Sequence, residues 1–534
     1  MKTIQHSDSN ARKIPSSGAF VTFFKSLFGS GLLALPNVLG RVGLVLGVVV
    51  YFIVAVGCAL SCYLLLRARE VTSQYLLGNH DQQLHQHHLV TYGDLADILL
   101  GHSMAKITRW SIIVQNVLFT AGLIIVICEN LSDIIRLWTG NDEQHHNEIG
   151  IDNNDDLSSR QYIGLFLFPI VVGLLQIPWL QDMWYISALG LFVYAIGVIG
   201  STLYSAFSTI LVTSDDATVG TEDVRSMPND IWEVKWDGVR TFVGSAVYAL
   251  EGINLAMPTV HSMRHPSEAK SVVCGGILLY GCLTLIFAAV GYAGGLGGGP
   301  GTGKSPEECD VVTKCITPQS LETTIQVALS VAMLLSVPVM LYPSTEMLEV
   351  MLTDRRKQHI KEMDCGKCPT YLTQLSLVEV NQHEGNNYAS SHLNENQVPL
   401  TDFGNDMTKE MTSIPTPKVG YASIENDTAT KEDTNAHEFS QDKSWTLRIF
   451  LAVLTVGLGT VTKSFTYFSG FVGAVCLSFV GFVLPPLLYF RAMEKANLIV
   501  SRPMQCSMMI LTLFGYYSIV IGGLSSFGDL IKSF

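Results

Sequence analysis

The chain has 534 residues, of which 48 % are apolar and only 15 % are charged, and its mean hydropathy is +0.33. This apolar share is larger than the core of one soluble domain needs, so it predicts an integral membrane protein. The formal net charge of −13 excludes a basic surface for nucleic acid, and the acidic residues lie mainly in polar segments such as Asn141–Asp156 and Glu379–Asp442.

Membrane-spanning helices appear in a sequence as apolar runs of about 17 to 25 residues. We expect about eleven spans, in this order: Ala19–Leu39, Val42–Leu66, Trp110–Trp138, Ile163–Leu180, Ile186–Val212, Arg240–Val260, Ser271–Gly295, Leu321–Leu352, Trp445–Thr462, Tyr467–Phe490 and Met504–Leu524. The third carries two acidic residues near its end and the fourth is short, so a count one higher or lower stays open. The first run is too long for the apolar part of a signal peptide, and we expect it to be retained.

The predicted spans divide this all-α multi-pass chain into four parts: a tail of residues 1–18, eight spans in residues 19–352, a polar insert of residues 353–444, and three spans in residues 445–534. The insert has few apolar residues to offset the entropy of folding, so we expect it to be mostly disordered. Its segment Tyr421–Ile424 fits a tyrosine-based sorting pattern, which is short enough to arise by chance.

Lysine and arginine are more frequent in the connectors on one side of the predicted membrane. Arg67, Arg69, Lys106 and Arg109 share that side with the N-terminal tail and the insert. Because cytoplasmic loops carry the excess of positive charge, we expect the N-terminus to be cytoplasmic. An odd number of spans then puts the C-terminus on the opposite side.

Two similar strings interrupt the first and sixth spans: G-S-G-L-L-A-L-P at Gly29–Pro36 and E-G-I-N-L-A-M-P at Glu251–Pro258. Glycine and proline weaken a helix, and non-helical backbone inside a membrane is tolerated only where it lines a cavity or is buried in protein. Paired interruptions in two halves of a chain indicate the binding site of a transporter. The offset of five spans makes the halves antiparallel, so we expect a 5+5 inverted repeat with one helix appended.

Both strings, with Gly244–Gly252, Leu341–Pro343 and Gly470–Cys476, resemble the amino acid/auxin permease family, in particular its proton-coupled and vacuolar amino-acid transporters. The similarity covers nearly all of the hydrophobic chain and omits the insert. It implies a LeuT-like inverted-repeat fold that moves amino acids. The long insert and the acidic loop after the third span depart from the family's pattern, and neither touches the interrupted helices.

An amino-acid zwitterion inside a membrane needs donors for its carboxylate and acceptors for its ammonium group. Unwinding of the first span exposes backbone N–H groups at the positive end of a half-helix, and the expected carboxylate cradle is Phe28, Gly29, Ser30, Gly31 and Leu32. Freed carbonyls near Gly252, with Ser245 or Tyr248, would receive the ammonium group. The alternative is that these small residues only let helices pack closely.

Glu251 is an acidic residue in the middle of a predicted span, where a charge is costly and usually functional. We expect it to carry a coupling proton, unless it only hydrogen-bonds the broken ends of neighbouring helices. Glu129, Asp133, Glu346 and Lys463 lie nearer to span ends, and we expect their charged groups to reach interfacial water.

Three loop patterns remain. Gly298–Ser305 matches a phosphate-binding loop, but a membrane helix precedes it where a strand is needed, so we expect a flexible loop and no nucleotide. Cys309 and Cys315 share one extracytoplasmic loop and are candidates for a disulfide, with bonded and free thiols both left open. Cys365 and Cys368 lack further metal ligands, so no metal and no cofactor are predicted.

The sequence thus predicts a secondary active amino-acid transporter, coupled to protons by preference, and no enzyme. Sodium coupling and an amino-acid-sensing receptor with little transport are the alternatives. The expected partners are the amino acid, the coupling ion and the lipid of a plasma, vacuolar or lysosomal membrane. The amino acid, the direction of transport and the oligomeric state stay open.

Overall fold

The computed structural model of the chain describes residues 15–78, 91–139, 153–176, 232–297, 309–316, 319–365 and 430–533, with a few residues between 192 and 207. Every regular element in these ranges is helical, which confirms the predicted all-α class. The chain forms two compact units, of which the larger comprises Met1–Glu349 and Ser444–Phe534, and the smaller Val350–Lys443. The larger unit contains all the predicted site residues.

The first predicted span consists of two helices, α1 (Ser16–Ser26) and α2 (Gly31–Gly40). The sixth likewise consists of α9 (Val239–Ala249) and α10 (Ile253–Ser262). Both interruptions fall at the glycines of the two strings. The prolines do not lie at the breaks: Pro36 and Pro258 are each the sixth residue of the half-helix that follows the break.

The remaining long helices match the other predicted spans. They are α3 (Leu44–Gly78), α5 (His102–Thr139), α6 (Asn153–Leu175), α11 (Ala269–Ala293), α12 (Gln319–Cys365) and α13 (Thr430–Val461). The tenth span consists of α14 (Phe465–Val472), the π-helical η7 (Gly473–Leu477) and η8 (Phe479–Val483), and α15 (Leu484–Lys495). The eleventh span consists of α16 (Arg502–Tyr517), the π-helical η9 (Ser518–Gly522) and α17 (Gly523–Ser533). The fifth predicted span lies mostly outside the described residues.

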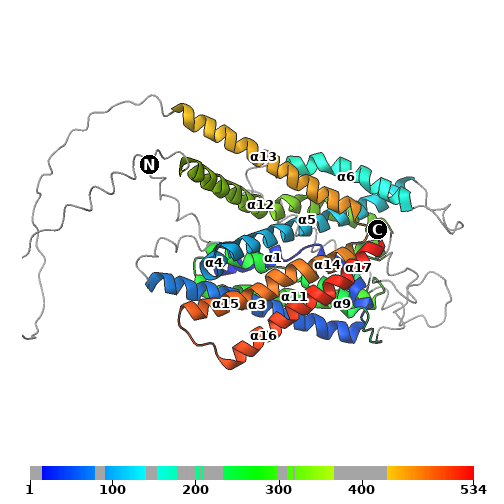
Figure 1. The fold of residues 1–534 in the computed structure, drawn as a ribbon. Coiled ribbons are helices and arrows are strands. Elements are labelled where there is room, and N and C mark those ends of the chain that lie inside the picture. Colours follow the sequence, from blue (N-terminus) through cyan, green and yellow to red (C-terminus); the bar gives the residue numbers. More distant parts are fainter. Residues whose placement is uncertain are drawn as a thin grey trace, which may run out of the picture. The chain divides into compact units, whose positions relative to one another are not determined.

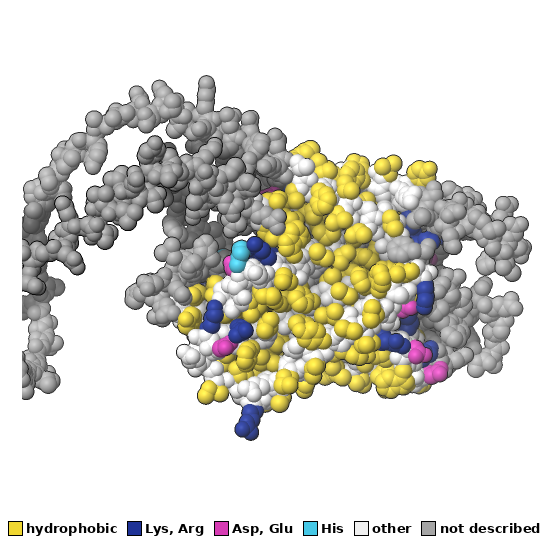
Figure 2. All heavy atoms as spheres, viewed as in Figure 1, with side chains coloured by type: hydrophobic (Ala, Val, Ile, Leu, Met, Phe, Trp, Pro, Cys, Tyr) yellow, Lys and Arg dark blue, Asp and Glu magenta, His cyan; other side chains and the backbone are white. Residues whose placement is uncertain are grey.

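Among the described residues, five helical stretches are long and apolar enough to cross a membrane: Leu44–Leu77, His102–Trp138, Pro266–Ala293, Phe465–Lys495 and Arg502–Lys532. Shorter apolar helices lie at Gly31–Gly40, Ser159–Leu175, Glu322–Pro338 and Trp445–Val461. Figure 2 shows hydrophobic side chains over the middle of one face and charged side chains toward its two ends. Such an apolar face is expected of a multi-pass membrane protein, while the count of eleven spans stays a prediction.

The insert begins and ends in helix. Helix α12 continues to Cys365 and α13 begins at Thr430, so residues 353–365 and 430–444 of the predicted insert are helical. Residues 366–429 lie outside the described part of the chain, and they include Cys368 and the Tyr421–Ile424 segment.

The short helix α4 (Tyr92–Leu100) was not predicted. The Thr91 side chain accepts from the Asp94 backbone N–H, and the Asp94 carboxylate accepts from the Thr91 N–H, so the pair forms a capping box. Arg109 of α5 binds the same carboxylate at 3.1 Å, which fixes α4 against α5.

The broken helices and their neighbours make contacts that occur in matching pairs. Helix α1 packs on α10 and α11, and α9 packs on α2 and α3. Helix α2 also packs on α11, α10 packs on α3, and α3 packs on α11. When α1, α2 and α3 are exchanged for α9, α10 and α11, the α3–α11 contact is left unchanged and each of the other contacts becomes another one of the set. Figure 1 shows α3, α15 and α16 running side by side in the same unit.

Candidate functional site

The two helix breaks meet each other. Gly31 begins α2 and Ala249 ends α9, and a Cβ atom on Gly31 would lie 2.7 Å from the Ala249 Cα and 3.0 Å from Tyr248 Cδ1. Across the same contact, the Ser30 hydroxyl lies 3.2 Å from the Tyr248 hydroxyl. The structure therefore brings the expected carboxylate cradle together with Tyr248, one of the expected ammonium partners.

Aromatic rings surround this meeting point. The Tyr248 ring stacks on Phe119 of α5, with centroids 5.0 Å apart, and meets Phe465 of α14 edge-on at 5.9 Å. A Cβ on Gly29 would lie 2.7 Å from Phe119 Cζ. Phe119, Tyr248 and Phe465 are buried, so this aromatic cluster closes the space beside the break.

The other residues predicted to bind the carboxylate or the ammonium group of the substrate lie away from this contact between the two breaks. The Phe28 ring packs edge-on against Tyr280 of α11 at 5.1 Å, and Leu32 is buried in the core. Gly252 precedes α10, and a side chain there would overlap Leu27. Ser245 faces Gly470 of α14. At Gly252 and Ser245, the geometry therefore agrees with the alternative that small residues only let the helices pack closely.

Glu251 lies in the second break and is held by two amides. Its Oε1 accepts from Gln115 Nε2 of α5 at 2.7 Å and from Asn254 Nδ2 at 3.3 Å. Sequence reasoning missed both partners. Asn254 is a polar residue within the second string, which is a usable signal, whereas Gln115 is one polar residue in a long span.

A pocket opens beside Glu251. It is lined by Cys58, Ser61, Cys62, Val247, Leu250, Glu251, Gly252, Ile253, Ile277, Leu477, Gly481 and Phe482. These residues come from α3, the second break with the adjoining turns, α11, and the π-helical part of the tenth span. Most of the wall is apolar. The Ser61 hydroxyl is buried and has no hydrogen-bond partner among the described residues.

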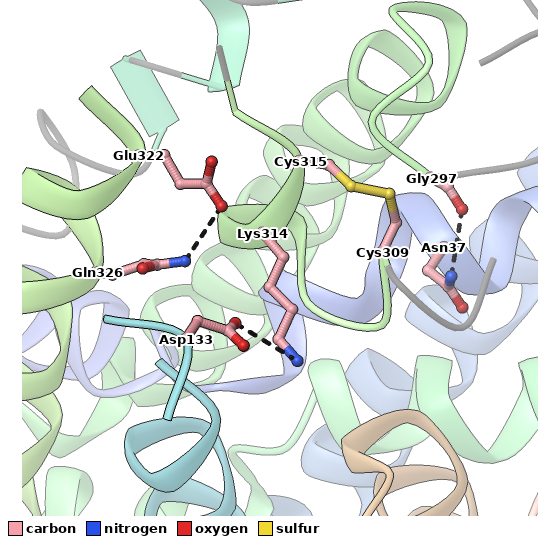
Figure 3. Close-up of a disulfide and its surroundings, with 8 residues drawn as sticks. All are labelled: Asn37, Asp133, Gly297, Cys309, Lys314, Cys315, Glu322 and Gln326. Carbon is pink, nitrogen blue, oxygen red and sulfur yellow. Dashed lines mark hydrogen bonds and ion pairs between the residues drawn. A yellow bond between two sulfur atoms is a disulfide. The ribbon is translucent and has the colours of Figure 1, made fainter. Parts of the chain in front are cut away.

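Cys309 and Cys315 form a disulfide with a Cα–Cα distance of 5.7 Å. The short loop that it closes lies among several helices (Figure 3). Lys314 lies 3.3 Å from the Glu129 carboxylate and 3.7 Å from that of Asp133, both on α5. The Asp310 carboxylate accepts from the Ser464 hydroxyl and the Thr466 N–H at the start of α14.

The expectation that Glu129 reaches interfacial water is wrong. Its side chain is 1 % exposed and lies between Lys314 and Arg160, whose Nη1 is 3.9 Å away. Burial lowers the pKa of Lys314, but the carboxylates of Glu129, Asp133 and Asp310 outweigh burial and raise it overall. The Asp133 side chain is 28 % exposed, which agrees better with the expectation that its charged group reaches water. The Glu346 side chain lies outside the described residues.

No cluster of three or more His, Cys, Asp or Glu side chains suited to a metal occurs within the described ranges. The Gly298–Ser305 loop lies outside them.

A family model described as "Transmembrane amino acid transporter protein" matches residues 13–527. The chain belongs to this family. The resemblance inferred from the interrupted spans is thereby confirmed. Membership, together with the apolar helices, supports a multi-pass membrane protein, while the activity and the site residues of this chain remain a matter of proposal.

Two curated relatives of the chain are distant ones. The chain is 24 % identical to vacuolar amino acid transporter 4 of Saccharomyces cerevisiae over 62 % of its own length and 40 % of that protein. It is also 24 % identical to amino acid transporter AVT3C of Arabidopsis thaliana, over 63 % of this chain and 71 % of the relative. The chain thus spans well under half the length of the yeast relative.

Two solved transporter structures resemble the fold weakly. MhsT in complex with L-phenylalanine gives a TM-score of 0.45 at 12 % identity, covering 95 % of this chain and 98 % of that one. Mhp1, a nucleobase-cation-symport-1 family transporter, gives 0.44 at 11 % identity, covering 100 % and 97 %. Both scores are too low to establish a shared fold.

Proposed function

We propose that this protein is a secondary active amino-acid transporter that works by alternating access and is coupled to protons. The observation that carries the proposal is the contact between the two breaks, where Gly31 meets Ala249 and Ser30 meets Tyr248. In a member of an amino-acid transporter family, paired interruptions at one point favour a substrate site.

The backbone of the first break supplies the carboxylate site. The first N–H groups of α2 have no partners within that helix and lie at its positive end, so residues Phe28 to Leu32 would hold the amino-acid carboxylate. The last carbonyls of α9, which likewise lack partners within their helix, would accept from the ammonium group together with the Tyr248 hydroxyl. Ser245 faces α14 and has no part in this step.

Alternating access requires two related halves that move against each other. The paired contacts of α1–α3 and α9–α11 support an inverted repeat, because exchange of the two sets leaves the pattern unchanged. The closed aromatic cluster of Phe119, Tyr248 and Phe465 would then open toward one side at a time.

Glu251 is the proposed carrier of the coupling proton. It lies in the second break, within the membrane-spanning part, where an ionisable side chain is usually functional. Gln115 and Asn254 hold one of its oxygens in place. Sodium would be the coupling ion if this carboxylate served only to support the break.

The orientation and the membrane form part of the same proposal. The excess of Lys and Arg in one set of connectors favours a cytoplasmic N-terminus. Several relatives are named vacuolar amino acid transporters, which favours a vacuolar or lysosomal membrane.

The test is a transport assay with the purified full chain in liposomes. A panel of radiolabelled amino acids is offered with a pH gradient, a sodium gradient or neither, and each gradient is imposed in both directions. Accumulation driven by the pH gradient supports the proposal. Accumulation driven only by the sodium gradient would mean that sodium, and not the proton, is the coupling ion. Binding of an amino acid without accumulation would favour a receptor.

A further inference from the structure

One face of α9 carries a row of polar side chains that leads toward Glu251. Thr241, Ser245 and Tyr248 are spaced by four and three residues, so they lie on the same side of the helix. Glu251 follows three residues after Tyr248, in the break. All three helical members of the row are buried.

The row begins at an acidic residue of the last helix. Thr241 Oγ1 donates to Asp529 Oδ2 of α17 over 3.5 Å, and the Asp529 side chain is 33 % exposed. Asp529 therefore connects the buried row to the surface near the C-terminal end of α17. Helix α17 packs on both α9 and α14.

The middle of the row contains two hydroxyl groups that face the same space. A Cβ on Gly470 of α14 would lie 3.4 Å from Ser245 Oγ and 3.3 Å from Ser526 Oγ of α17. Both serines are buried, and neither hydroxyl has a hydrogen-bond partner within the described part of the chain. Because buried hydroxyls nearly always have a partner, we take a water molecule shared by the two serines as part of this inference.

The inner end of the row lies at the candidate site. The Tyr248 hydroxyl is 3.2 Å from that of Ser30, and Glu251 is held by Gln115 and Asn254. The row thus lies between the partly exposed Asp529 carboxyl group and the second break, where Glu251 follows one helical turn after Tyr248.

We propose that this row is the route by which the coupling proton passes between the aqueous phase at Asp529 and Glu251. The inference rests on the proposed proton coupling. Each hydroxyl on the route accepts one proton and donates another, so only two groups change: the Asp529 carboxyl loses a proton and the Glu251 carboxylate gains it. Asp529 then takes a proton from water. Two members of the route, Ser526 and Asp529, come from the helix appended to the repeat.

In the described part of the chain, charged and titratable groups near the outer end come from α17, α9 and α14. Lys532 of the same helix has its Nζ 3.9 Å from Asp529 Oδ1 and is 82 % exposed. Helix α9 brings the exposed Arg240 next to Thr241, and α14 brings Tyr467, whose ring lies 4.7 Å from the Arg41 guanidinium.

The experiment compares two modes of transport in liposomes that contain the full chain and a mixture of radiolabelled amino acids. Accumulation under a pH gradient needs net proton movement, whereas counterflow exchange at equal pH does not. The variants are Asp529→Asn, Ser526→Ala and Gly470→Ala; the last would fill the space between the two hydroxyls without removing either. The controls are Ser525→Ala on the same helix and Lys532→Gln, which leaves Asp529 in place.

We expect each of the three variants to lower pH-driven accumulation about ten-fold or more, the scale of a lost proton-transfer group, while counterflow is kept. The pH profile of accumulation should flatten in Asp529→Asn, and both controls should behave as the parent chain does. Unchanged accumulation in Asp529→Asn and Ser526→Ala would overturn the route, and so would an equal loss of counterflow, which indicates a structural role. A parent chain that exchanges amino acids but ignores the pH gradient would overturn the proton coupling itself.

Discussion

Gly31 at the start of α2 and Ala249 at the end of α9 approach so closely that a Cβ on Gly31 would lie 2.7 Å from the Ala249 Cα. The neighbour is backbone, which cannot turn aside as a flexible side chain can. The contact between the two broken helices therefore depends on glycine at this point, and in the proposed function the approach of a substrate to the N–H groups of α2 would depend on it too.

Gly31→Val is expected to abolish amino-acid uptake, because its branched side chain would separate α2 from α9 and fill the cradle. Uptake into cells is measured alongside the amount of protein in the membrane. The matched control is Gly275→Val on α11, where an added Cβ meets nothing within 4 Å. Full uptake by Gly31→Val, with a normal amount of protein in the membrane, would show that Gly31 is not a residue of the substrate site.

Tyr248→Phe keeps the ring that stacks on Phe119 and removes the hydroxyl that pairs with Ser30. We expect uptake to fall by roughly three- to ten-fold, the range of one hydrogen bond. Ser30→Ala and the double variant complete a thermodynamic cycle. Because both hydroxyls belong to one pair, the double variant should lose less than the two single losses combined, and strict additivity would contradict the pairing.

Glu251→Gln preserves the size of the side chain and an oxygen for Gln115, but it removes titration. We expect pH-driven accumulation to disappear, while exchange across pre-loaded vesicles partly survives with a weaker dependence on pH. Gln115→Leu tests whether the amide positions the carboxylate, and a changed pH profile is expected. If Glu251→Gln accumulates substrate with the parent's pH dependence, the carboxylate is structural.

The Cys309–Cys315 disulfide closes the loop that presents Asp310 to α14 and Lys314 to α5. Replacing both cysteines by serine should lower stability by about 2 kcal/mol in the loop-entropy description of a cross-link this short. The apparent melting temperature of the detergent-solubilised protein measures this. Cys282→Ser, at an exposed free cysteine, is the control, and reductant should lower the melting temperature of the parent but not of the double variant.

Removal of residues 381–429 spares α12 and α13 and all the helices of the larger unit. Because a segment this poor in apolar residues has little surface to bury against the helices, we expect substrate affinity to stay within about a factor of three. The Michaelis constant for uptake gives the comparison. A larger change would mean that the insert contributes to the substrate path.

The interrupted helices were predictable because glycine weakens a helix locally and because the two strings occupy corresponding places, five spans apart. The burial of Glu129 could not be predicted, because its partner Lys314 comes from a distant loop that only the fold brings to α5. Helix α4 was missed because its apolar run is too short for a membrane span, although Thr91 and Asp94 carry a capping signal. The role of Gln115 depends entirely on a contact across the fold, so no local pattern could have marked it.

The π-helical turns of the last two spans join those spans to each other. Ser478, between η7 and η8, places its hydroxyl 2.8 Å from that of Ser518 at the start of η9, and both are buried. Helix α14 also packs on α17, so the tenth and eleventh spans are held together both at their π-helical turns and at their neighbouring ends. If the proposed proton route exists, a movement of the tenth span against α9 would disturb both α14 and α17, which carry Gly470, Ser526 and Asp529.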